Sequence, residues 1–103
     1  MPITLVAAAG TRVPLTATAN ISGARITLQR LAANVGTIYV GIPSIGNTGA
    51  LVSSILYDAY LDASNPSITI GMGETMADSA RADLINIDAG TNGDGVAWFV
   101  ENI

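Results

Sequence analysis

Short segments rich in β-branched and other apolar residues recur along the chain, separated by Gly, Asn and Asp at intervals of roughly ten residues. Ile, Val, Leu and Thr dominate these segments, and such residues suit a pleated, half-buried surface. Regularly spaced short strands divided by turn residues are typical of sandwiches and barrels. The pattern therefore predicts an all-β fold: a small, jelly-roll-like antiparallel β-sandwich, formed by residues 1–103 as a single domain.

Residues at every second position are apolar in several of these segments, which places one side of each strand in the core. Arg25–Gln29 and Thr37–Gly41 show this alternation, and the turn between them predicts that they pair as a hairpin. Pro14 limits its own segment to an edge strand or a bulge. Trp98 is expected in the core. The expected strands are Ile3–Ala8, Arg12–Ala17, Arg25–Gln29, Thr37–Gly41, Ser67–Gly71, Leu84–Asp88 and Val96–Val100.

The run Asn92-Gly93-Asp94-Gly95 is the strongest turn signal in the chain. Asn and Gly tolerate positive φ, so the run predicts a tight hairpin turn between two strands. An alternative is a calcium loop, because Asn92, Asp94, Gly95 and Glu101 fall at ligand or turn positions of an EF-hand-like spacing. Gly90 occupies the first ligand position, however, and a following strand carries Glu101 away. Whether a cation binds near Asp88 or Asp94 stays an open question.

Ala50–Leu61 allows two interpretations. Its apolar residues recur at the spacing of one short helix, but the same residues could form a bent strand beside a long loop, and both interpretations stay open.

The residue types that most enzymes need are missing. The chain has no His and no Cys, and its four basic residues are all Arg. Most general bases, thiol nucleophiles and zinc sites are thereby excluded. Asp58 and Asp62 are the nearest pair of carboxylates, and solvated surface acids explain them better than a catalytic pair does. Gly71-Met72-Gly73 begins a dinucleotide-binding pattern, but Met76 stands where that pattern needs its third Gly. We expect no enzyme activity, no metal and no cofactor.

Charge and hydropathy limit the partners. A net charge of −4 argues against binding nucleic acid, since that requires clustered Lys and Arg. No apolar run reaches the length of about 18 residues that spans a membrane, and no export signal is recognisable. Only 12% of residues are charged against 50% hydrophobic, whereas soluble domains average about 25% charged. This excess of hydrophobic over charged residues predicts that the protein self-associates. The candidate interface residues are Arg25, Arg30, Leu56, Tyr57, Tyr60 and Phe99.

With these segments placed, the chain resembles small β-sandwich virion proteins of bacteriophages. The resemblance lies in residues 13–18, 25–29, 34–41, 73–74, 85–89 and 92–96. It implies a capsid decoration (cement) protein on the outer surface of a phage head, made in the host cytoplasm. Such a protein would form a homo-oligomer, most simply a trimer, and stabilise the shell by binding the major capsid protein.

A tail or baseplate module that recognises a host glycan is the alternative. That function predicts a concave site with exposed aromatic and polar side chains, whereas decoration predicts broad, flat apolar patches.

Overall fold

Ten β-strands form the regular structure of the described residues, which are 2–17, 22–23, 25–41, 57–71, 80–81 and 85–101 of this computed structural model. No helix occurs within these ranges, and hence none that is long and apolar enough to cross a membrane. The all-β prediction is confirmed.

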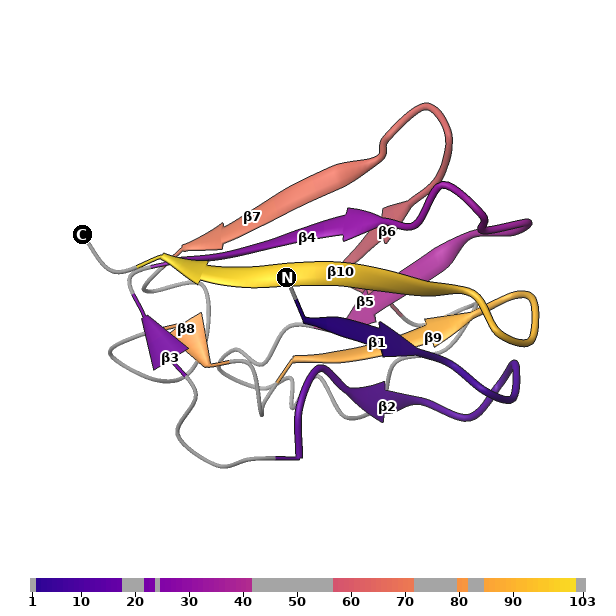
Figure 1. Cartoon of the computed structure of the whole chain (residues 1–103), viewed down its shortest axis with the longest axis horizontal. Helices are drawn as coiled ribbons and strands as arrows, with labels where there is room; N and C mark the ends of the chain where they lie inside the picture. The colour runs from indigo at the N-terminus through magenta and orange to yellow at the C-terminus, as the bar shows by residue number, and fades with distance from the viewer. Residues whose placement is uncertain are drawn as a thin grey trace.

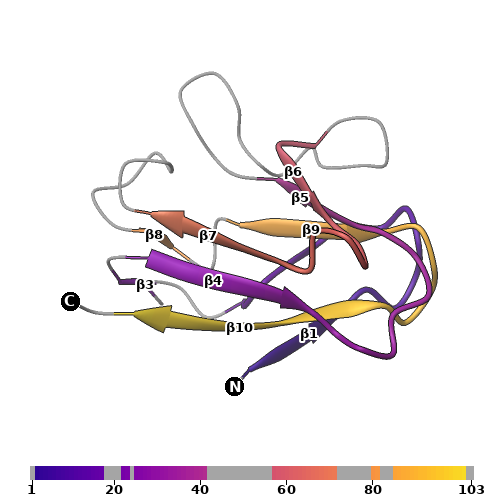
Figure 2. The ribbon, with the colours of Figure 1, turned by 90° about the horizontal axis from the view of Figure 1, so that it is seen from above.

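Eight of these strands form two antiparallel sheets of four, which lie in separate layers when the molecule is seen from above (Figure 2). The first sheet has the order β1 (Ile3–Leu5), β10 (Gly95–Glu101), β4 (Arg25–Arg30) and β7 (Ser67–Gly71). The second has the order β2 (Val13–Pro14), β9 (Asn86–Ala89), β5 (Ile38–Gly41) and β6 (Ala59–Leu61). A short pair, β3 (Ser22–Gly23) and β8 (Ala80–Arg81), lies at one end of the first sheet (Figure 1).

The strand pairing is nested. β1 pairs with β10, β2 with β9, β3 with β8, β4 with β7 and β5 with β6, all antiparallel. The chain is thus arranged as one long hairpin whose paired arms are wrapped into two facing sheets by the further pairings β10 with β4 and β5 with β9. This strand order is that of a jelly roll, which confirms the predicted architecture.

Alternation along the strands builds the core between the sheets. Ile26 and Leu28 of β4 face Ile38 and Val40 of β5, and all four side chains are fully buried in one cluster. Each contributes about 1.5–3 kcal/mol by leaving water. Trp98 lies in the same cluster, as predicted, and its indole Nε1 donates a hydrogen bond to Thr4 Oγ1 at 3.0 Å. The donor therefore has a partner although the ring is buried.

Two predicted hairpins are wrong. The segments at 25–29 and 37–41 belong to different sheets, and so do the strands on either side of Asn92–Gly95. The tight turn itself is present, since Gly93 has φ +86°, but it connects β9 of the second sheet to β10 of the first. In this nested pairing, β4 and β5 follow each other along one arm and β9 and β10 along the other, and each passes from one layer to the other. A turn signal between such strands therefore does not identify the partner of either strand.

The interpretation of Ala50–Leu61 is resolved only at its C-terminal end. Ala59–Leu61 forms β6, which pairs with β5, and is therefore strand rather than helix. Residues 50–56 lie outside the described residues.

The β6–β7 turn gives a testable pH effect. The Ser64 hydroxyl and the Ser64 and Asn65 amides donate hydrogen bonds to Asp62 Oδ1 at 2.8–2.9 Å. These bonds, the Ser64 hydroxyl foremost, hold the pKa of Asp62 below its ordinary value of 3.8. A lowered folded-state pKa means that ionised Asp62 stabilises the fold above the unfolded pKa, and this contribution is lost as pH falls through the folded value.

We therefore expect an NMR titration to give Asp62 a pKa below 3.8 and Ser64→Ala to raise it. An unchanged pKa in the variant would show that the hydroxyl is not the main cause.

Candidate functional site

One end of the sandwich holds a dense polar network around Asp94. This side chain is 5% exposed and follows the β9–β10 turn. Its carboxylate accepts hydrogen bonds from the Val35 amide at 3.0 Å and the Gly36 amide at 2.7 Å. Next to it, the Asn34 side chain exchanges two hydrogen bonds with the backbone of Gly95. These contacts fasten the β4–β5 connection to the β9–β10 turn, so the role of Asp94 is structural.

Asp88 is also buried, at 1% exposure. Its Oδ1 accepts hydrogen bonds from the amides of Gly10 at 3.0 Å and Ala89 at 2.8 Å. Glu101, the last position of the calcium spacing, lies at the far end of β10 and pairs with Arg25. The strand carries Glu101 away from the turn, as predicted. Among the described residues no three His, Cys, Asp or Glu side chains gather as metal ligands.

The outer face of the first sheet carries an apolar corner. Thr4 points inward to Trp98, so its neighbours Ile3 and Leu5 point outward and are 60% and 52% exposed. On β10, Ala97 is the register partner of Ile3, and Phe99 lies two residues further on the same face. We call these residues, Ile3, Leu5, Ala97 and Phe99, the apolar corner.

The predicted interface residues do not form one surface. Phe99 and Arg25 lie on the outer face of the first sheet, where the Arg25 Nε donates to Glu101 Oε2 at 2.9 Å. Arg30 instead donates through Nη2 to the Asn34 carbonyl at 3.0 Å, which ties down a loop. Tyr60 belongs to β6 of the second sheet, and Tyr57 lies just before that strand. Leu56 lies outside the described residues.

The three tyrosines of the chain gather at the second sheet. Tyr39 of β5 and Tyr60 of β6 are register partners, and Tyr57 precedes β6. The ring of Tyr57 lies 5.2 Å from that of Tyr39 and 6.1 Å from that of Tyr60 between centroids. Tyr57 and Tyr60 are more than 40% exposed. We call the three residues the tyrosine cluster; sequence reasoning identified Tyr57 and Tyr60 but not Tyr39.

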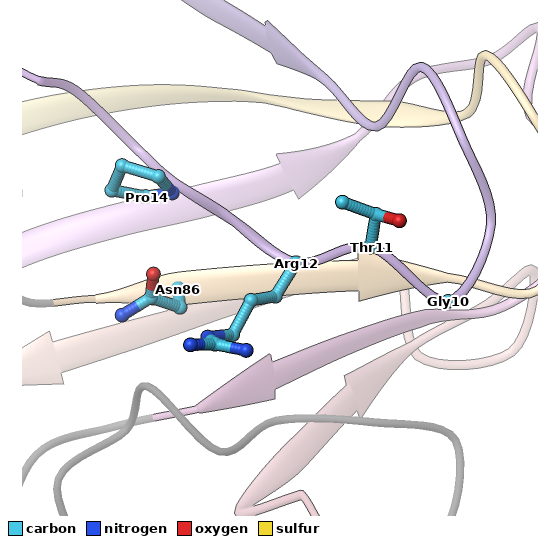
Figure 3. A pocket seen from close by; sticks show the side chains of 5 residues that line it. All are labelled: Gly10, Thr11, Arg12, Pro14 and Asn86. Carbon is cyan, nitrogen blue, oxygen red and sulfur yellow. The ribbon is translucent and has the colours of Figure 1, made fainter.

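A cavity of about 590 Å³ opens on the same sheet, lined by Gly10, Thr11, Arg12, Pro14 and Asn86. Figure 3 shows the Arg12 side chain leaving its loop and extending over the strand that carries Asn86. The volume falls within the range of about 300–1,000 Å³ typical of ligand sites. Sequence reasoning missed this cavity, because Arg12 and Asn86 are 74 positions apart and only the β2–β9 pairing brings them together.

In comparisons with protein-family models, curated proteins and solved structures, no match to this chain was found.

Proposed function

We propose that this protein is a capsid decoration protein that self-associates and binds the outer surface of a phage head. The observation that carries the proposal is the apolar corner, where Ile3 and Leu5 present more than half of their area to solvent on one sheet face. The jelly roll is a fold that viral capsid proteins use, and the sequence resemblance points in the same direction. Fold alone does not assign a function, so the exposed surface carries the argument.

In the proposed mechanism, the protein acts by non-covalent association and catalyses no reaction. Covering the apolar corner removes apolar area from water, and each Å² contributes about 25 cal/mol. A small subunit offers little area alone, but an oligomer repeats the contact and multiplies its effect by avidity. A ring of subunits bridging neighbouring capsomers would then oppose expansion of the shell. The paired Arg25 and Glu101 at the other end of β10 give that face a polar rim.

The test is binding to phage heads. Purified protein is mixed with empty heads of the phage that encodes it, the heads are sedimented, and the bound copies are counted by quantitative mass spectrometry. Decoration predicts saturable binding of hundreds of copies per head. Binding of a few copies at the tail vertex, or of none, contradicts it.

Polar substitution in the apolar corner should weaken self-association. We expect Leu5→Ser to shift the sedimentation-velocity distribution toward monomer, with a dissociation constant raised about tenfold, because it removes one exposed leucine from the contact. Val35→Ser is the matched control, since Val35 is 82% exposed and lies in the β4–β5 connection rather than on a strand of the first sheet. If the two substitutions have equal effects on the dissociation constant, the self-association contact lies outside the apolar corner.

A second candidate function is glycan recognition by a tail or baseplate module. The tyrosine cluster and the cavity favour it, because exposed aromatic rings beside a concave polar surface are the features that this function predicts. Jelly rolls also serve as lectin domains.

A further inference from the structure

We infer that the outer face of the second sheet binds a saccharide that carries an acidic group, with Arg12 holding the anion and the tyrosine cluster contacting the sugar rings. The inference rests on the second candidate function above and names its ligand class and its site.

Arg12 is the first element of the site. It is exposed and lines the cavity. Two other arginines have partners within the chain: Arg25 pairs with Glu101, and Arg30 donates through Nη2 to the Asn34 carbonyl, although its buried Nε has no partner. In the part of the chain that the structure describes, Arg12 has no such partner. A guanidinium presents several donors in a fixed plane that matches a carboxylate or sulfate, so an anionic group is the ligand chemistry that suits it.

The register of the second sheet connects Arg12 to the tyrosine cluster. Val13 pairs with Ile87, so Arg12 is one position further along, beside Asp88. Asp88 in turn pairs with Tyr39, and Tyr39 with Tyr60. Neighbouring strands are about 4.8 Å apart, which puts the backbones of Arg12 and Tyr39 about 10 Å apart. The cation and the rings therefore lie in one row across the outer face.

The row also contains one carboxylate, that of Asp88, between Arg12 and Tyr39. The Asp88 side chain is 1% exposed, and two backbone amides donate hydrogen bonds to its Oδ1. A ligand on the surface therefore meets Arg12, Asn86 and the rings rather than the carboxylate.

The ligand must have an apolar face as well as an anion. Aromatic side chains bury large apolar area and prefer flat or edge contacts, and the C–H face of a pyranose supplies such a surface. The Thr11 hydroxyl at the cavity can donate or accept a hydrogen bond with a sugar hydroxyl group. An acidic sugar combines all of these features, whereas a simple anion leaves the rings uncovered and a neutral sugar leaves Arg12 without a counterion.

The test is NMR titration of the full chain with galacturonic acid trisaccharide and with its neutral counterpart, galactose trisaccharide. We expect the acidic sugar to shift Arg12, Tyr39 and Asn86 and to bind at least about tenfold more tightly than the neutral one. Arg12→Gln should remove this preference, and Tyr60→Ala should weaken binding about fivefold. Arg25→Gln, on the opposite sheet, is the control and should change nothing.

Three results overturn the inference: equal affinity for both sugars, no binding by the folded wild type, or a change in oligomer mass with Tyr60→Ala while saccharide binding is unaffected. The last would make this face a contact between copies. None of these results bears on binding to heads, so the decoration proposal is tested separately.

Discussion

Replacing Gly95 with alanine is expected to lower the free energy of unfolding by at least about 3 kcal/mol, the largest effect of any single methyl group that we foresee in this chain. A Cβ at this position would overlap the Thr4 carbonyl oxygen and lie 2.9 Å from Leu5 Cα. Backbone cannot yield as a flexible side chain can, so β1 would have to separate from β10. Urea denaturation measures the loss of unfolding free energy. Faster hydrogen exchange at the Leu5 amide would show that the loss arises where β1 meets β10.

Gly90→Ala is the matched control for this substitution. Its nearest neighbour would be the Thr37 carbonyl oxygen at 4.0 Å, which is an ordinary contact, so we expect a change within about 0.5 kcal/mol. If both variants unfold at the same urea concentration, the close approach of β1 to β10 is not a feature of the protein.

Asp94→Asn is expected to cost about 2–3 kcal/mol at neutral pH. The carboxylate accepts hydrogen bonds from two backbone amides, at Val35 and Gly36. An amide side chain keeps one acceptor oxygen and turns a donor toward groups that are themselves donors. Hydrogen bonds to a charged group contribute about 1.5–3 kcal/mol, and leaving a buried donor unpaired adds a penalty.

Glu101→Gln makes the same chemical change at the surface. Its partner Arg25 is 44% exposed and Glu101 37%, and exposed ion pairs contribute about 0–1 kcal/mol. Denaturation of the two variants side by side therefore separates the buried network from a loss of charge. A larger loss at Glu101 than at Asp94 would refute the structural role given to Asp94.

Seven of the ten strands were predictable because each is encoded locally, whereas β3, β6 and β8 were not among the expected strands. Alternation identified the inward residues of β4 and β5, Pro14 indicated an edge strand, and β2 is indeed at the edge of its sheet. The partners of the strands were not predictable in the same way. Pairing in a jelly roll joins segments as distant as β1 and β10, and the strongest turn signal, at Asn92–Gly95, leads from one sheet to the other.

The surface was less predictable than the core. Tyr57 and Tyr60 stood out by residue type, but Tyr39 joins them only through the pairing of β5 with β6. Arg12 gives no local signal at all, since its cavity is built with Asn86 from a distant strand. Arg30 was expected at an interface, yet its bond to Asn34 serves the loop network. In each case the missing information was a contact between residues far apart in sequence.

The measurement that tests the central claim most directly is the molar mass of the purified protein by light scattering, alone and with empty heads. A protein that functions by association through the apolar corner should have a mass well above the 10.5 kDa of one chain, near three times that value for a trimer, and should be depleted from solution when heads are added. A monodisperse species at 10.5 kDa that ignores the heads contradicts the account.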